Sequence, residues 1–396
     1  MSIIQKPLLL GVVALLIVGS IAYLELQKPK IVAPQEIPET QAPLGENISA
    51  TSTALGGAPQ NLSPQNLAAI IAEKKAKYPR AVEIANPSGF VNAAPFKIAD
   101  LVGKKVILVD FWTYSCINCQ RTLPYITAWD SAYRDQGLAV VGIHTPEFEF
   151  EKKYENVKAA VERFGVKYPV VQDNDYGTWR AYGNQYWPHK YLIDIDGFIV
   201  YDHIGEGSYD ITEKKIQELL AERAVRLGVE MKNSGGLASG KVKGVAVGDV
   251  QSPETYFGAA RNEFLGNGTP GRTGVQTFTI PAAERAHALY LGGTWDFQNE
   301  FAENKSSGAR ILYKYHARNV YFVGDADVPV KIRVLRDGKD PMSAAGSDVS
   351  RDAQGAFITV KDSRLYKIIE DTDYGTHTLE LIIESPGMRA FTFTFG

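Results

Sequence analysis

Three patterns of apolar and polar positions follow one another along the chain. The first is Pro7–Leu24, which carries no charge and is just long enough for a helix that spans a bilayer. It predicts a single transmembrane anchor at residues 7–24, after a short tail at residues 1–6, with a cleaved signal peptide as the alternative. Residues 25–64 are then a flexible linker, because Ile31–Pro64 contains five prolines and no lysine or arginine.

The second pattern, in residues 65–228, alternates strands with helices. Lys105–Phe111 is a continuous apolar run, typical of a strand that is buried on both faces. Asp196-Gly197 between two later runs is a strong hairpin signal. The other predicted elements are helices Gln65–Tyr78, Tyr154–Phe164, Thr178–Tyr182 and Thr212–Leu227, and strands Leu138–Thr145, Val170–Val171, Tyr191–Asp194 and Phe198–His203. This order predicts an α/β domain with a mixed central sheet that has helices on both faces.

The third pattern begins after a second linker at residues 229–245. Residues 246–396 are rich in aromatic, β-branched and glycine residues and contain few helical runs. The strands predicted there are Ala309–Ala317, Val320–Val323, Val328–Leu335, Ala356–Val360, His377–Ile383 and Arg389–Phe395. Short strands at nearly regular spacing predict an all-β sandwich or jelly roll.

Composition and charge exclude several classes of protein. Hydrophobic residues make up 45% and charged residues 22% of the chain, which is enough for more than one core and excludes general disorder. The net charge of −3 provides no basic field, so no nucleic-acid partner is predicted. The two cysteines are too few for a disulfide-rich scaffold or a four-cysteine metal site. We predict no metal and no cofactor.

The two cysteines form the motif Cys116-Ile-Asn-Cys119 directly after the buried strand. Cys116 is then at the N-terminus of a helix, where unpaired backbone N–H groups and the helix dipole favour a thiolate over a thiol. Cys116 is therefore the expected attacking sulfur. Cys119, one turn later, is the expected resolving sulfur in a reversible Cys116–Cys119 disulfide. A structural or metal-binding pair is the alternative, although a metal would need two further ligands.

The segment Leu108–Cys116 resembles the strand that leads into the active site of the thioredoxin superfamily. The resemblance implies that Asp110 is a buried acid that moves protons for Cys119, with a pKa raised by desolvation. It also implies that Trp187-Pro188 forms a loop with a cis proline, which offers backbone groups to the substrate. Trp112 and Pro124, the latter matching the proline that kinks the active-site helix, are assigned structural roles.

The segments WTYSCINCQRTLPY, YLGGTWDF and RAFTFTFG narrow the resemblance to DipZ-like proteins among the membrane-tethered, TlpA-like thioredoxins. It covers roughly residues 80–396. It implies a thioredoxin-like domain, a β-sandwich similar to carbohydrate-binding modules, and exchange with disulfide-containing protein substrates. We expect a single-pass protein of a bacterial membrane with extracytoplasmic domains. DipZ-like proteins usually also carry a CcdA-like membrane domain, so the implied electron source is a separate CcdA-like membrane protein or a soluble thiol donor.

Residues outside the motif are weaker candidates. Glu147 follows a strand end and is expected either to contribute to substrate binding, together with Trp187 and Pro188, or to face solvent. Thr113 precedes Cys116 by three positions, as in thiol peroxidases of the same superfamily. Four aromatic residues are candidates either for a sugar-stacking platform or for the core of the β-sandwich: Trp295, Tyr256, Phe297 and Tyr366. A glycan or an envelope protein is accordingly a candidate partner of the β-sandwich.

The favoured hypothesis is a membrane-tethered, extracytoplasmic thiol–disulfide oxidoreductase that reduces protein disulfides. A disulfide-forming oxidase uses the same chemistry in the other direction, and Ile117-Asn118 in place of the usual Gly-Pro leaves the reduction potential open. A thiol peroxidase and a binding protein that acts through the β-sandwich are the further alternatives.

Overall fold

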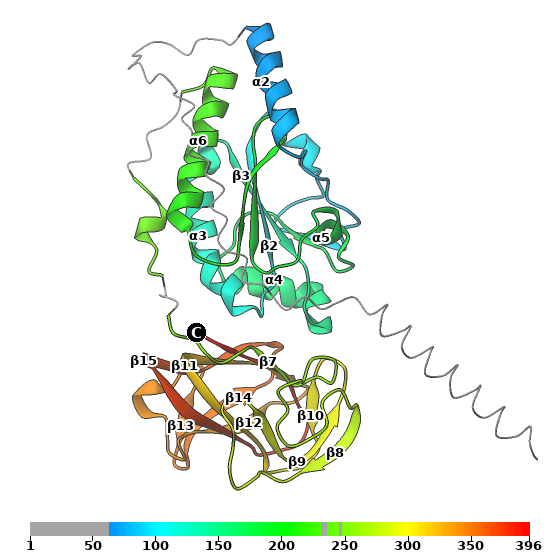
Figure 1. Cartoon of the computed structure of the whole chain (residues 1–396), viewed down its shortest axis with the longest axis vertical. Helices are drawn as coiled ribbons and strands as arrows, with labels where there is room; N and C mark the ends of the chain where they lie inside the picture. Colours follow the sequence, from blue (N-terminus) through cyan, green and yellow to red (C-terminus); the bar gives the residue numbers. More distant parts are fainter. Residues whose placement is uncertain (1–62, 231–235, 245–247) are drawn as a thin grey trace, which may run out of the picture. The chain divides into compact units, whose positions relative to one another are not determined.

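The computed structural model describes residues 63–230, 236–244 and 248–396. The predicted membrane segment at residues 7–24 and nearly all of the first linker lie outside these ranges. Within them, no helix combines the length and the apolar character that crossing a bilayer would need. Pro59–Gly396 forms one compact unit, in which an α/β part precedes a strand-rich part (Figure 1).

A mixed six-stranded sheet forms the centre of the α/β part, in the order β1-β4-β3-β2-β5-β6. Its central strand β2 pairs in parallel with β3 and antiparallel with β5. The strands are β1 (Gly89–Val91), β2 (Val106–Trp112), β3 (Leu138–His144), β4 (Val170–Gln172), β5 (His189–Ile193) and β6 (Ile199–Ile204). The helices are α2 (Pro64–Lys77), α3 (Ile117–Tyr133), α4 (Tyr154–Arg163), α5 (Gly177–Ala181) and α6 (Tyr209–Leu227). The predicted mixed sheet is confirmed.

Alternate residues of β2 enter two different cores, as expected for a strand with both faces covered. Val106 and Leu108 pack with side chains from α3, α4 and α6. Ile107 and Val109 pack on the opposite face, with residues of the segment 81–102 and of α5. Figure 1 shows α3 and α6 side by side on the first face, where the α3 and α6 side chains also share hydrogen bonds. The prediction of helices on both faces is therefore confirmed.

The strand-rich part consists of ten strands in one hydrogen-bonded network. They are β7 (Thr255–Tyr256), β8 (Gly274–Phe278), β9 (Leu289–Phe297), β10 (Ala302–Asn304), β11 (Ala309–Ala326), β12 (Val330–Arg336), β13 (Ser350–Asp352), β14 (Gly355–Val360), β15 (Arg364–Ile383) and β16 (Met388–Phe395). The two longest strands, β11 and β15, pair with each other over most of their length. The predicted strand-rich character is confirmed.

The two longest strands also show where the sequence pattern misleads. It predicts Ala309–Ala317 and Val320–Val323 as separate strands, but both belong to β11. A register shift between Ala317 and Asn319 bends this strand without ending it, as a β-bulge does. The pattern also misses β9, the short strands β7, β8, β10 and β13, and residues 364–376 of β15.

The aromatic residues proposed for sugar stacking lie mainly in the core of the strand-rich part. Trp295, Phe297 and Tyr366 are at most 1% exposed, so these three side chains cannot present a flat surface to a sugar. Only Tyr256 is partly exposed. The platform interpretation is wrong for the three buried residues, because their large apolar surfaces stabilise the sheet more when they are removed from water.

Part of the predicted second linker is anchored to the α/β part. Ser239–Lys241 forms a 3₁₀ turn. The backbone N–H groups of Ala238 and Ser239 donate to the carboxylate of Glu213 on α6, at 2.5 and 2.8 Å. This carboxylate also accepts a hydrogen bond from Trp129 of α3 at 3.1 Å. The connection between the two parts is therefore fixed at this point.

Candidate active site

The strand β2 leads directly into the turn that carries the cysteines. All of β2 is buried, and the chain turns through residues 113–115 before α3 begins at Ile117. The Gln120 side chain donates a hydrogen bond to the carbonyl of Tyr114 at 2.9 Å. Its backbone N–H donates to the carbonyl of Cys116 at 3.0 Å. The buried strand and these bonds fix where the helix starts.

Cys116 caps the N-terminus of α3 and is partly exposed, whereas Cys119 is 1% exposed. The disulfide between the two residues stays a prediction. Burial raises the pKa of Cys119 well above its ordinary value, and contact with Cys116 raises it further. An accessible sulfur at a helix N-terminus next to a buried partner is suited to thiol–disulfide exchange.

Asp110 lies inside β2 and is 1% exposed. Its Oδ1 atom has no hydrogen-bond partner in the described part of the chain. Burial raises the pKa of Asp110 to about 7, and the positive charge of Lys190 opposes this rise. A carboxyl with a pKa near neutrality is able to accept and return a proton at physiological pH.

Lys190 is the charged neighbour of Asp110. It comes from β5, in register with Asp110 on β2. Its side chain is fully buried, and Nζ donates to the carbonyl of Gly205 at 2.7 Å. Burial lowers the pKa of Lys190, while the negative charges of Asp110 and Cys119 act to raise it. The core next to the cysteines therefore contains the carboxyl of Asp110 and the amine of Lys190.

The Trp187–Pro188 peptide bond is cis, as the resemblance implies. Pro188 is buried, and its carbonyl accepts a hydrogen bond from the backbone of Gly205 at 2.8 Å. The Trp187 indole donates to the carbonyl of Thr145 at 3.1 Å and packs on Trp179, with 4.3 Å between the ring centroids. These contacts fix Trp187 in the wall of a cavity that Cys116 also lines.

Glu151 is a fully buried carboxylate in the loop after β3. Its Oε1 accepts hydrogen bonds from the backbone and the hydroxyl of Ser115, at 3.1 and 2.7 Å. Its Oε2 accepts from the backbone N–H groups of Glu147 and Phe148, at 2.6 and 3.0 Å. Burial raises the pKa of Glu151, and hydrogen bonds oppose the rise. Glu151 therefore ties the residue before Cys116 to the loop that carries Glu147.

An open cavity of about 360 Å³ lies beside Cys116. The α/β part lines it with Cys116, Ile117, Asn118, Glu147, Gln185, Tyr186 and Trp187, and the strand-rich part with Ser252, Glu254, Tyr256, Arg261, Thr394 and Phe395. Glu147 bridges the two parts, because its Oε1 accepts hydrogen bonds from Tyr256 at 2.8 Å and from Arg261 at 2.9 Å. The cavity thus gathers Cys116, Trp187 and Glu147, whereas Asp110 remains in the core.

The remaining residues singled out from the sequence take structural positions. Trp112 is buried and meets His144 edge to face, 5.2 Å between ring centroids. Pro124 lies inside α3 and is exposed. Thr113 is fully buried, and its hydroxyl lies 3.4 Å from Nε2 of His144.

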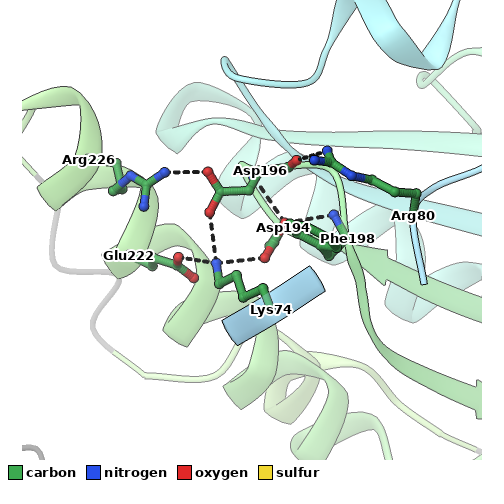
Figure 2. A network of polar contacts seen from close by, with 7 residues as sticks. All are labelled: Lys74, Arg80, Asp194, Asp196, Phe198, Glu222 and Arg226. Carbon is green, nitrogen blue, oxygen red and sulfur yellow. Dashed lines mark hydrogen bonds and ion pairs between the residues drawn. The ribbon is translucent and has the colours of Figure 1, made fainter. Parts of the chain in front are cut away.

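One acidic cluster has the spacing of a cation site. Asp194, Asp196 and Glu222 each place an oxygen within 4.8 Å of the others. Figure 2 shows the Lys74 ammonium among them, 2.7 Å from Asp194 and 3.0 Å from Asp196. Lys74 also pairs with Glu222, and Arg226 pairs with Asp196. The protein therefore supplies its own cation, and the cluster attaches α2 to the rest of the α/β part.

Comparison with known proteins gives the family. Residues 80–220 match the family described as "Redoxin", and residues 252–396 match "Thioredoxin like C-terminal domain". The thiol-disulfide oxidoreductase YkuV of Bacillus subtilis (strain 168) is 30% identical over 122 residues, which cover 31% of this chain and 82% of YkuV. The chain belongs to the thioredoxin superfamily.

Two further relatives extend this assignment. Protein DipZ of Mycobacterium tuberculosis (strain CDC 1551 / Oshkosh) is 34% identical over 318 residues, which cover 80% of this chain and 43% of DipZ. The chain therefore spans less than half the length of that relative. The thiol-disulfide oxidoreductase ResA of Bacillus thuringiensis (strain Al Hakam) is 29% identical over 136 residues, which cover 32% of this chain and 76% of ResA. The predicted resemblance to DipZ-like members of the superfamily is confirmed.

Sequence reasoning missed several residues of this thioredoxin-superfamily site. A lysine inside the otherwise apolar run after Pro188 is a signal that could have pointed to Lys190. Glu151 closes the segment EFEFE, which gives no sign that one of its three glutamates is buried. No sequence pattern pointed to Glu254 or Arg261, because only the packing of the strand-rich part against the active-site turn brings them to the cavity.

Proposed function

We propose that this chain is a thiol–disulfide oxidoreductase that reduces disulfides of protein substrates. The observation that carries the proposal is the arrangement of the two cysteines at α3. Cys116 is accessible at the N-terminus of the helix, and Cys119 is buried one turn later, in a core that contains Asp110. The similarity of this chain to the thiol-disulfide oxidoreductases YkuV and ResA supports the same chemistry.

The proposed reaction has two exchange steps. In the first, the Cys116 thiolate attacks one sulfur of the substrate disulfide, that bond breaks, and the other substrate sulfur leaves as a thiolate. In the second, Asp110 accepts the proton of Cys119, and the Cys119 thiolate attacks Sγ of Cys116. The mixed disulfide breaks and the second substrate thiolate leaves and takes up a proton. Two electrons pass to the substrate, and a Cys116–Cys119 disulfide remains.

The substrate-binding roles of Trp187, Pro188 and Glu147 belong to the same proposal. Trp187 and Glu147 line the cavity beside Cys116. The carbonyl of Pro188 bonds to Gly205, so the backbone available to a substrate in this loop is that of the neighbouring residues.

The equilibrium reduction potential of the Cys116–Cys119 pair tests the direction of electron flow. We expect a value near about −270 mV or lower, typical of a reductase. A value near about −120 mV would make the protein an oxidant that donates disulfides. Cys119→Ser protein should trap a mixed disulfide with the substrate, and Cys116→Ser protein should not react. Failure of the pair to form an intramolecular disulfide would contradict the proposal and favour a binding role for the strand-rich part.

We further propose that the protein works outside the cytoplasm of a bacterium, tethered to the membrane through residues 7–24. The uncharged run Pro7–Leu24 and the proline-rich linker after it support this location. The electrons would come from a CcdA-like membrane protein or a soluble thiol donor, and the strand-rich part would fold as a β-sandwich that holds the enzyme near a partner or the envelope. A reporter fused after residue 64 should be extracytoplasmic; a cytoplasmic reporter would contradict the proposed location.

A further inference from the structure

The cavity beside Cys116 has two walls that come from opposite halves of the chain. One wall belongs to the cysteine turn and the cis-proline loop, and includes Asn118 and Trp187. The other belongs to the strand-rich part, and includes Glu254, Tyr256 and Arg261. Any substrate disulfide that reaches Cys116 through this cavity must pass between the two walls.

The second wall is held firmly against the first. Tyr256 lies in β7, which pairs with β16, and its hydroxyl donates to Glu147. The Arg261 guanidinium lies 3.6 Å from the centre of the Tyr256 ring. Phe391 of β16 packs on Phe150, with 4.7 Å between the ring centroids. The wall is therefore part of a packed interface between the two parts rather than a loose loop.

The lining of the whole cavity carries two carboxylates, Glu147 and Glu254, but one cation, Arg261. Arg261 forms its ion pair with Glu147 at 2.9 Å, and its charge also acts on Glu254, so one cation serves two carboxylates. Desolvation by the cavity walls and the charge of Glu147 raise the pKa of Glu254, while Tyr256 and the charge of Arg261 act to lower it; the residue remains open to solvent. A carboxylate in such a place gains from a positively charged partner. Trp187 lines the same cavity and is an aromatic residue of the kind that attracts cations, whereas the Tyr256 ring already holds Arg261.

Building on the proposed function, we propose that this cavity binds the residues that flank the substrate disulfide and that Glu254 selects a lysine or arginine there. The substrate class is then a protein or peptide whose reactive cystine has a cationic neighbour. Glu254 and Tyr256 act as specificity-determining residues, and the strand-rich part completes the substrate site instead of only positioning the enzyme.

Two cystine peptides that differ in one residue test this inference. One carries lysine next to the cysteine and the other glutamate, and both are reacted with the reduced full-length protein at pH 8 and low salt. We expect the lysine peptide to oxidise the dithiol about tenfold faster, because complementary charges steer and hold the substrate. The preference should shrink at high salt, which screens charges that are open to solvent.

Variants identify the residue responsible. In Glu254→Gln protein the ratio of the two rates should fall toward one. Glu155→Gln removes an exposed carboxylate at the start of α4, outside the cavity lining, and should keep the preference. A ratio near one in the unmodified protein, or a full preference in Glu254→Gln protein, would overturn the inference while leaving the oxidoreductase proposal intact. If neither peptide nor neutral bis(2-hydroxyethyl) disulfide oxidises the dithiol, the proposed function itself fails.

Discussion

Two buried aspartates of the α/β part, Asp110 inside β2 and Asp194 directly after β5, have different surroundings. Asp194 follows β5, and its Oδ1 accepts backbone hydrogen bonds from Asp196 and Phe198 at 3.0 and 2.9 Å. Its Oδ2 has no partner in hydrogen-bond geometry in the described part of the chain, but lies 2.7 Å from the Lys74 ammonium in an ion pair (Figure 2). No residue that the structure describes forms a hydrogen bond with Oδ1 of Asp110, and the charge of Lys190 offsets its burial only in part.

Burial alone does not decide whether a carboxyl has a structural or a chemical role. Both aspartates are at most 1% exposed. A buried carboxylate that accepts backbone hydrogen bonds on one oxygen and has a cation beside the other, as Asp194 does, stabilises one conformation. A buried carboxyl that lacks partners keeps its proton more tightly and becomes available for proton transfer. We therefore assign the cluster around Lys74 to structure and Asp110 to chemistry.

Removing Lys74 should have the largest effect on stability. Burial lowers the pKa of Lys74, but hydrogen bonds to three carboxylates raise it by more, so the ammonium is strongly bound. Lys74→Met leaves these carboxylates without their shared cation, and we expect the free energy of unfolding to fall by about 3–5 kcal/mol. Chemical denaturation measures this loss. The matched control Lys75→Met changes an exposed neighbour on α2 and should cost less than about 0.5 kcal/mol; equal losses would show that the cluster is not an anchor.

Neutralising Asp110 should instead change how stability depends on pH. The pKa of Asp110 rises from 3.8 to about 7 on folding, so the folded protein holds this proton more tightly than the unfolded chain. Its contribution to stability is therefore fully present below about pH 4 and is lost as the pH rises to 7. Relative to Asp110→Asn, the natural protein should lose up to about 4 kcal/mol across this range. Parallel stability curves from pH 4 to pH 7 would contradict the raised pKa.

The sequence predicted the burial of Asp110 but not the partners of either aspartate. The apolar run before the cysteines predicted that Asp110 is buried, because a strand covered on both faces buries every side chain. The partners of both aspartates come from distant segments. Lys190 meets Asp110 through the register of β5 on β2, and Lys74 reaches Asp194 only because α2 packs beside the β5–β6 turn. Such pairings depend on tertiary packing, which local patterns do not encode.

The fold itself was more predictable in the α/β part than in the strand-rich part. Each strand of the sheet except the short β1 has its own apolar run, bounded by helices or by the Asp196-Gly197 turn. In the strand-rich part, β11 and β15 run on through polar and glycine positions such as Arg318 and Gly375. At these positions the register between β11 and β15 shifts, as in a β-bulge, but the two strands stay paired on both sides of the shift. The end of an apolar run therefore does not mark the end of the strand.

The rate of the resolving step should separate Asp110 from Asp194 in function. If Asp110 takes the proton of Cys119, Asp110→Asn should slow the release of the mixed disulfide about 10²-fold, a typical loss for a general base. In the natural protein this rate should rise with an apparent pKa near 7. Lys190→Met removes the charge that lowers the pKa of Asp110, so this pKa should rise further. The increase in the resolving rate should then occur at higher pH. Stopped-flow fluorescence of the mixed disulfide measures the resolving rate and its pH dependence in each variant. An unchanged pH profile in Asp110→Asn would exclude Asp110 as the group that takes the proton of Cys119.

The smallest effect concerns how α2 is held by the Lys74 cluster. None of the residues of α2 is buried, and Ser63 caps the helix by accepting a hydrogen bond from the backbone of Asn66 at 3.2 Å. Ser63→Ala should cost about 1 kcal/mol in the natural protein, because a destabilised α2 weakens the hold of Lys74 on the carboxylates. In the Lys74→Met background α2 is no longer attached through the cluster, and the same substitution should have almost no effect on global unfolding. Such coupling between two positions on one helix is what a double-mutant cycle measures. Equal costs of Ser63→Ala in both backgrounds would mean that α2 is held by its partly buried apolar residues instead, and that the paired carboxylates stabilise only the β5–β6 turn.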